Sequence, residues 1–502
     1  MNRPIYHGGN YKVLSENEVK KIHEGTMEVL EKAGFKIEYK PALDLLEENG
    51  AKIDREKSKA YIPRSLVSKC IKQAPGEFTF YGQEEGREIV LGGTRVHFGT
   101  GGMAVNVLDL DRVKRPSFCR DIADIAILVE KLDYLDFFIV PVYPHDAPLN
   151  RVEVNKFFHS LCYSSKPVMG GIYSLTGLNE VISMASHIAG GVEKLISRPF
   201  IGFITSISSP LKMDELSTQL LMEVSAWGLP LATSTAPIAG ITSPVTLAGT
   251  LVQQNAEALM GVILSQLKNP GTPILYSAVP STMDMKTMAY LMGSIESGIM
   301  NAAITQMAHY YRLPCYITVG TSDSKLPDAQ AAYESSKNCV LAALAGGNFV
   351  HEAAGLLEGA LTASYAQYVI DNDIIGACLR TLRGVEVDDD RLAVDLIISL
   401  NSEGSYITQP HTVKYMRTES FFPQVSDRSS YTKWKKEGER DSWKISEEIA
   451  HKILGGERKK VISDVIEKEL RERHEGLIDI EEQESEKVTS PEDEIPYEAY
   501  SN

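Results

Sequence analysis

The sequence predicts a (β/α)₈ barrel, and two patterns lead to this prediction. Seven short apolar runs alternate with helical segments between residues 136 and 383, and an eighth apolar run lies near residues 95–108. Continuous apolar strands joined by helices are typical of a parallel sheet that is covered on both faces. Eight such units favour closure into a barrel. A doubly wound open sheet is the alternative, which is less favoured because no glycine-rich phosphate loop follows any strand.

The limits of the expected elements follow from these runs. Strands are expected at residues 95–98 or 104–108, 136–143, 167–172, 200–205, 229–234, 273–278, 314–320 and 348–353. Helices are expected at residues 121–132, 177–189, 213–227, 244–267, 293–312, 328–345 and 365–383. Two of these helices are expected to begin at Ser209-Pro210 and Ser243-Pro244, because serine caps free amides and proline suits the first helical turn.

The chain divides into four parts. Residues 1–90 are expected to form an N-terminal helical cap, whose first helix begins at the capping box of Ser15 and Glu18 and ends at Gly34. Residues 91–425 form the catalytic barrel, and residues 426–478 form a C-terminal helical extension. The acidic tail at residues 479–502 is expected to be disordered, because its composition cannot bury a core.

Composition and charge exclude several classes of protein. The 502-residue chain has a net charge of −16, and half of that charge comes from nine acidic residues and one lysine after residue 478. The absence of a basic stripe argues against binding of nucleic acid or of an anionic membrane surface. Without an apolar leader or a long apolar run, the chain is expected to be cytoplasmic.

The cysteines and histidines predict no metal site. The six cysteines are scattered without a CxxC pair, and the sequence has no HExxH motif. Such cysteines are typical of small buried side chains in a reducing compartment. We therefore expect this chain to bind no metal of its own.

Polar residues at the C-terminal ends of barrel strands are the candidates for chemistry. Thr321, Ser322 and Asp323 lie in a long loop after one strand, and His351 ends the last strand. Glu257 lies in a polar run near the start of a long helix. The plain alternatives are a loop with Asp328 as a helix cap, a hydrogen-bonded core histidine, and a paired or surface carboxylate. No carboxylate pair of a glycosidase and no Ser–His–Asp order is evident, which disfavours an unrelated barrel hydrolase or lyase.

Three segments carry a resemblance to a known family. Residues 319–334 (VGTSDSKLPDAQAAYE), residues 243–257 (SPVTLAGTLVQQNAE) and Asp371-Asn372-Asp373 resemble the trimethylamine methyltransferase superfamily. The similarity runs from the N-terminal helices to about residue 440. It implies a barrel enzyme that moves a methyl group from an amine to the cobalt of a corrinoid. The corrinoid is carried by a separate small protein that docks at the barrel mouth.

One departure from the family pattern concerns the substrate. The archaeal trimethylamine enzymes carry pyrrolysine just before the motif SDxKxPDxQA, a position that falls within one residue of Thr321. This chain therefore resembles the non-pyrrolysine branch, which includes glycine betaine methyltransferases. A quaternary amine leaves as a neutral amine, so its demethylation needs positioning and exclusion of water rather than a general acid. The candidates for a catalytic role are Thr321, Asp323 and Glu257.

A quaternary cation is held by aromatic faces, and each contact contributes roughly 0.5–2 kcal/mol. Two or three of six aromatic residues are expected to line the site: Phe98, Tyr143, Tyr276, Tyr316, Tyr333 and Tyr365. His351, Thr321, Ser322 and backbone amides are expected to bind the carboxylate of a betaine. Glycine betaine, proline betaine, carnitine and γ-butyrobetaine all fit. A non-catalytic subunit that binds betaine or docks the corrinoid protein is the alternative, and a homo-oligomer stays open.

Overall fold

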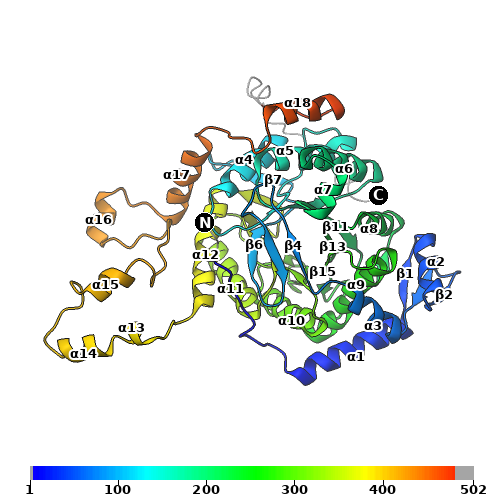
Figure 1. Cartoon of the computed structure of the whole chain (residues 1–502), viewed down its shortest axis with the longest axis horizontal. Coiled ribbons are helices and arrows are strands. Elements are labelled where there is room, and N and C mark those ends of the chain that lie inside the picture. The colour runs from blue at the N-terminus through cyan, green and yellow to red at the C-terminus, as the bar shows by residue number, and fades with distance from the viewer. Residues whose placement is uncertain (1–3, 481–502) are drawn as a thin grey trace.

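Eight parallel strands form a closed barrel at the centre of the computed structural model, which describes residues 4–480 (Figure 1). In order around the barrel they are β6 (His97–Thr100), β9 (Phe138–Ile139), β10 (Val168–Gly171), β11 (Ile201–Ile207), β13 (Leu231–Thr235), β15 (Ile274–Ser277), β18 (Cys315–Thr318) and β19 (Phe349–Ala354). Gly99 pairs with Phe137 in parallel and joins the first strand to the second. The predicted (β/α)₈ barrel is confirmed.

A helix follows each barrel strand and packs outside it. These helices are α4 (Cys119–Glu130), α5 (Val152–Tyr163), α6 (Leu175–Ala189), α8 (Glu215–Trp227), α9 (Leu247–Lys268), α10 (Ile295–Tyr311), α11 (Ala329–Ala345) and α12 (Tyr365–Arg383), with the short η1 (Leu149–Arg151) and α7 (Val192–Ser197) beside them. Seven of the eight helices were predicted to within a few residues. The sequence prediction missed α5, in which every residue is buried, including the polar residues Glu153, Asn155 and Lys156.

The prediction that two Ser–Pro pairs begin helices is wrong. α8 begins after Asp214, whose side chain accepts from the Ser217 amide, and α9 begins at Leu247. Ser209-Pro210 lies instead in a tight turn between β11 and β12 (Lys212–Met213), where Ser208 pairs with Lys212. The hydrogen-bonded turn leaves no free helical amides near Ser209 for a serine cap to satisfy.

The N-terminal part combines helices with a small sheet. α1 (Glu16–Lys32) begins at the predicted capping box of Ser15, and α2 (Lys40–Glu48) and α3 (Arg64–Gln73) follow. β1 (Phe35–Ile37), β2 (Lys52–Asp54) and β3 (Lys59–Tyr61) form a sheet with β12. Both α1 and α3 pack on α9 of the barrel.

A hairpin closes the N-terminal end of the barrel. β4 (Glu77–Phe80) and β5 (Ile89–Gly92) pair in antiparallel fashion. Phe80, Ile89 and Leu91 are buried in the same cluster as the barrel side chains Phe137 and Phe349. This bottom end is therefore filled with apolar side chains.

Two small sheets are built from loops at the opposite end. One contains β7 (Asn106–Leu108), β8 (Lys114–Pro116), β20 (Leu356–Leu357) and β21 (Thr362–Ser364), and the other contains β14 (Ile238–Ala239), β16 (Ser281–Met283) and β17 (Tyr290–Leu291). The expected strand at residues 104–108 thus lies outside the barrel, and β6 is the barrel strand. Because these loops leave the C-terminal ends of barrel strands, both sheets border the barrel mouth.

The C-terminal part has two different halves. α13 (Asp389–Leu392), α14 (Val394–Leu400), α15 (Pro410–Tyr415) and α16 (Tyr431–Lys436) extend away from the barrel and contain no buried residue (Figure 1). α17 (Ser442–Leu454) packs against α12 and α4, and α18 (Asp464–Arg473) packs against α6. Nearly all of the expected tail, from residue 481 onward, lies outside the described residues. Within residues 4–480, no helix is long and apolar enough to cross a membrane.

Candidate active site at the barrel mouth

Aromatic and ionisable side chains gather at the C-terminal end of the barrel. Lys156 comes from α5, Tyr173 follows β10, Tyr316 lies on β18, and His351 and Glu352 lie on β19. We refer to these five residues as the mouth cluster. Four of them are nearly or fully buried, whereas Tyr173 is 51% exposed and lies at the rim.

The aromatic side of the cluster continues the packing inside the barrel. Phe349 stacks on Phe137 with ring centroids 3.5 Å apart, and Tyr316 lies 5.8 Å from Phe349. Above them the imidazole of His351 stacks on Tyr316 at 4.6 Å. The interior therefore changes from apolar rings to polar rings toward the mouth.

An irregularity in β19 turns two consecutive side chains toward this region. The pairing register between β19 and β6 shifts between Val350 and Ala354, and Glu352 has a φ of 59°. Strand alternation would place His351 and Glu352 on opposite faces. The bulge and the left-handed residue bring their side-chain atoms Nε2 and Oε1 within 3.7 Å. Backbone strain of this kind is typical of functional sites.

The carboxyl group of Glu352 is buried with few partners. The Thr321 hydroxyl donates to Glu352 Oε2 at 3.1 Å, and no ion pair with lysine or arginine compensates the carboxylate among the described residues. Burial raises the pKa of Glu352 to about 8. A Cβ at Gly101 would collide with Glu352, so a glycine is needed where this loop passes the carboxyl group.

His351 is a neutral group in this setting. Its Nδ1 lies 3.1 Å from the Thr318 hydroxyl, whereas Nε2 has no hydrogen-bond partner among the described residues. Burial lowers the pKa of His351 to about 3. The imidazole therefore provides a polar but uncharged wall beside Glu352.

Lys156 lies on the other side of the mouth and is completely buried. Its ammonium donates to the Gly171 carbonyl at 3.2 Å, lies 3.6 Å from Met103 Sδ, and lies 4.6 Å from the centre of the Tyr173 ring. Burial lowers the pKa of Lys156 to about 8. The nearby Glu153 carboxylate does not pair with it, because it accepts from the Ser174 amide and hydroxyl.

The side of the mouth that contains Glu352 is linked to the side that contains Lys156 in two ways. The loop at residues 101–103 touches Glu352 through Gly101 and Lys156 through Met103. Burial raises the pKa of Tyr316 well above its ordinary value, and both Glu352 and Tyr173 add to the rise. The phenol of Tyr316 therefore interacts electrostatically with residues on both sides of the mouth.

The comparison with known families decides which family this architecture belongs to. The model of the trimethylamine methyltransferase (MTTB) family matches residues 2–475. The chain belongs to the trimethylamine methyltransferase family. Enzymatic methyl transfer from a methylated amine is the activity that the family supports.

Relatives in this family carry two kinds of name. The chain is 36% identical to a trimethylamine methyltransferase and 34% identical to a glycine betaine methyltransferase, both from Desulfitobacterium hafniense. These matches cover 88% and 85% of this chain, respectively, and 89% of each relative. The trimethylamine methyltransferase of Methanosarcina thermophila is 30% identical, over 92% of this chain and 97% of the relative.

A solved structure shares the fold. The hydroxylamine complex of MtmB superposes with a TM-score of 0.53 at 11% identity and covers 88% of both chains. At this identity the likeness supports the barrel architecture alone.

Four of the residues that we proposed from the sequence lie at the mouth of the barrel in this chain. They are His351, Tyr316, Thr321 and Tyr143, whose ring lies 5.0 Å from His145 beside the mouth. Ser322 and Asp323 lie just beyond: Ser322 donates to Glu334 at 2.7 Å, and Asp323 accepts from the Met292 and Gly293 amides. These last two organise the loop.

The other candidates lie away from the mouth cluster. Phe98 belongs to the outer core, Tyr276 donates to Asn255 on α9, Tyr333 is 55% exposed on α11, and Tyr365 donates to Asp121 on α4. Glu257 accepts from Ser209, Leu211, Thr235 and Gln253. Its position near the end of β13 fits a structural tie.

Sequence reasoning missed three functional candidates. Glu352 follows His351 in the last strand and Tyr173 follows β10, but neither was proposed as a site residue from the sequence. Lys156 lies on the helix that was not predicted. No pattern in the sequence marks Lys156, because VEVNKFFHSLCY mixes polar and apolar residues; its complete burial, which is rare for a lysine, is seen only in the structure.

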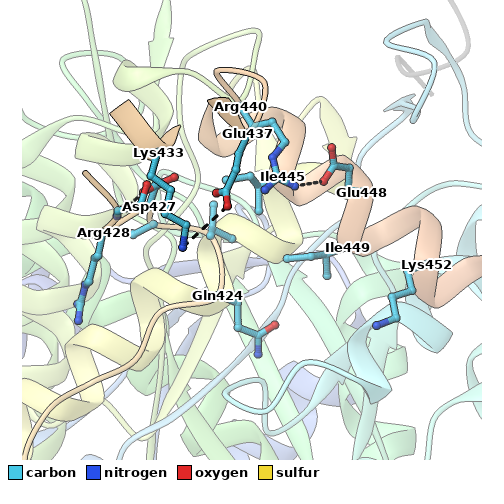
Figure 2. Close-up of a pocket in the computed structure, with 13 residues that line it drawn as sticks. Gln424, Asp427, Arg428, Lys433, Glu437, Arg440, Ile445, Glu448, Ile449 and Lys452 are labelled. Atoms are coloured by element: carbon cyan, nitrogen blue, oxygen red, sulfur yellow. Dashed lines mark hydrogen bonds and ion pairs between the residues drawn. The ribbon is translucent and has the colours of Figure 1, made fainter. Parts of the chain in front are cut away.

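Two cavities lie away from the mouth. One of about 670 Å³ lies between α16 and α17, where Arg440 pairs with Glu448 and Lys433 pairs with Glu437 (Figure 2). Another, of about 840 Å³, lies at the bottom end of the barrel beside His97 and Asp136. Neither lies at strand C-termini. Among the described residues no group of three or more His, Cys, Asp or Glu is arranged to hold a metal.

Proposed function

We propose that the protein transfers a methyl group from a quaternary amine, glycine betaine or a related betaine, to the cobalt(I) of a corrinoid carried by a separate protein. The observation that carries this proposal is the buried carboxyl group of Glu352 beside the stacked rings of Tyr316 and His351. A negative charge and aromatic faces together complement a methylated cation. Thr321, at the position of pyrrolysine in the resemblance, donates to this carboxyl group.

The relatives support methyl transfer from an amine, and their names suggest two substrates, trimethylamine and glycine betaine. Their names include both trimethylamine and glycine betaine methyltransferases at similar identity. Trimethylamine is a poor methyl donor until its nitrogen is activated, whereas a quaternary nitrogen is already activated. A carboxyl group and neutral side chains are sufficient for the second substrate, because no acid has to protonate a leaving nitrogen.

The proposed step balances without a proton. The N–CH₃ bond breaks with both of its electrons left on nitrogen, which gives a neutral tertiary amine, and the methyl group passes to the acceptor, whose cobalt(I) supplies the electron pair of the new bond. Glu352 and Tyr316 hold the cation, and the uncharged imidazole of His351 lies beside the carboxyl group. Their burial excludes water and fixes one methyl group toward the open side of the mouth.

The test is a demethylation assay of the full chain with reduced free corrinoid. Glycine betaine, proline betaine, carnitine, γ-butyrobetaine and trimethylamine are compared by the loss of cobalt(I) absorbance and by mass spectrometry of the amine. We expect turnover of at least one betaine and none of trimethylamine. Comparable turnover of trimethylamine contradicts the proposal, and calorimetric binding of a betaine without any turnover identifies a non-catalytic subunit instead.

A further inference from the structure

The mouth of the barrel contains a carboxyl group and an ammonium group that do not pair with each other. Glu352 belongs to β19, whereas Lys156 belongs to α5 and contacts the backbone at the end of β10. Tyr316 interacts electrostatically with Glu352 and with Tyr173, the ring that covers Lys156. A buried ammonium and a separate buried carboxyl group complement a dipolar ligand, because the first can bind its anionic end and the second its cationic end.

Lys156 lacks the partner that a buried lysine ordinarily has. A fully buried ammonium is costly unless it is paired and hydrogen-bonded. Among the described residues, Lys156 donates to one carbonyl oxygen, and its other close neighbours are a thioether sulfur and the Tyr173 ring. Lys156 forms no ion pair among the described residues, and Glu153, which lies one turn earlier on α5, accepts instead from the Ser174 amide and hydroxyl. The ammonium of Lys156 therefore has no ion-pair partner of its own in this part of the chain.

We infer that Lys156 binds the carboxylate of the substrate, so that the mouth takes a dipolar amino-acid derivative with its methylated ammonium beside Glu352 and Tyr316. This inference rests on the proposed methyl transfer. It assigns the anionic end to a residue on the opposite side from His351. An anion at His351 would lie beside the Glu352 carboxylate, whose Oε1 is 3.7 Å from the imidazole.

Movement of the rim residue Tyr173 would let the substrate carboxylate reach the ammonium of Lys156. Its ring covers the ammonium at 4.6 Å, yet half of the side chain is exposed. Rotation of an exposed side chain is fast, so the ring can turn outward and leave the ammonium to the incoming anion. The aromatic face holds the charge of Lys156 while no substrate is bound.

The test compares two ligands that differ in the carboxylate. Glycine betaine and tetramethylammonium are titrated by calorimetry into the wild-type protein and into Lys156→Met, which keeps the length of the side chain and removes its charge. We expect glycine betaine to bind at least about tenfold more weakly to the variant, as for loss of a charge-assisted contact. Tetramethylammonium is expected to bind equally to both proteins.

A matched control separates this role from a structural one. Lys166 is also fully buried, but it donates to the Val129 and Leu132 carbonyls at 2.5 and 3.3 Å. Lys166→Met is expected to lower the melting temperature and to leave the preference for glycine betaine unchanged. Lys156→Met is expected to melt at the wild-type temperature or above, because an uncompensated buried charge is removed.

The possible failures are distinguishable. An equal loss of affinity for both ligands in Lys156→Met, or an unchanged affinity for glycine betaine, overturns the inference while wild-type demethylation still supports the proposed function. If the wild-type protein binds glycine betaine through Lys156 but demethylates no amine, the proposed function fails and the carboxylate site stands.

Discussion

Two buried glutamates at the same end of the barrel have opposite surroundings. Glu257 accepts hydrogen bonds from four groups, which tie α9 to the turn after β11. Glu352 accepts from one hydroxyl and adopts a left-handed backbone conformation. Burial raises the pKa of both; four hydrogen bonds oppose the rise for Glu257, whereas the pKa of Glu352, opposed by one, reaches about 8. Burial of a carboxyl group thus does not identify a site, whereas unfilled hydrogen-bonding capacity does.

Replacing Glu352 is expected to have the largest effect on function. In Glu352→Gln the charge that faces the ammonium is lost, so methyl transfer from glycine betaine should fall about 100-fold, or about 2.7 kcal/mol. The rate is measured with reduced corrinoid under saturating conditions. A fall of less than about threefold would show that the carboxyl group does not contact the cation.

Stability should change in the opposite direction. A folded pKa of about 8 lies above the ordinary value of 4.5, so wild-type stability is complete below about 4.5 and declines as the pH rises toward 8. Glu352→Gln removes this decline and should be more stable than wild type by about 1–3 kcal/mol near pH 8. Chemical denaturation at about pH 5 and 8 measures the difference; the same decline in both proteins would assign it to another group.

The pH dependence of binding sharpens the contrast further. A cation must displace the proton of Glu352, so the affinity for tetramethylammonium should rise about tenfold per pH unit between about 6 and 8 and then level off. For glycine betaine, loss of the Lys156 proton near the same pH opposes this rise, and the affinity should pass through a maximum. His351 stays neutral throughout. Identical pH profiles for the two ligands would contradict the inference that Glu352 binds the cationic end of the substrate and Lys156 binds its carboxylate.

His351 gives a smaller effect that distinguishes two roles. From the sequence, His351→Ala is expected to weaken betaine binding about tenfold without a change in fold. If the imidazole acts by orienting Glu352, tetramethylammonium loses the same factor. If only glycine betaine is affected, His351 binds the carboxylate as the sequence suggested. A lower melting temperature with unchanged affinity would remove His351 from the site.

Glu257→Gln is the control for burial and should have the smallest effect on turnover. The amide cannot accept from all four donors, so the melting temperature should fall, with a loss of about 1–3 kcal/mol. The KM for glycine betaine should remain within about twofold, since nothing links Glu257 to the mouth cluster. A large fall in turnover with intact stability would restore Glu257 as a catalytic candidate.

The fold was predictable because its signals are local. Seven helices and all eight barrel strands follow from apolar runs and their punctuation, and the Ser15 capping box marks the start of α1. α5 was not predicted, and its polar residues, such as Glu153 and Lys156, are buried together with its apolar ones. The turn at Ser209-Pro210 was not predicted, because its stabilising partner, Glu257, lies 48 residues away along the chain.

The site was less predictable because it depends on tertiary geometry. Strand ends pointed to His351, Tyr316 and Thr321, which do meet at the mouth. Alternation alone would have put Glu352 on the far face, and no pattern in the sequence announces the bulge in β19. The aromatic candidates were chosen by type, so residues such as Tyr276 and Tyr365, which donate to helices, could not be told from those at the mouth.

The β4–β5 hairpin closes the N-terminal end of the barrel, so that the barrel opens only at its C-terminal end. Phe80, Ile89 and Leu91 fill the bottom, so nothing can pass through the barrel from below. In the proposed reaction, the amine and the acceptor protein must therefore share one face. If the acceptor docks over the mouth, as the resemblance implies, the amine has to bind before it docks, and the demethylated product can leave only after it departs. With the bottom closed, such docking would impose a strict order of binding and release on the two substrates.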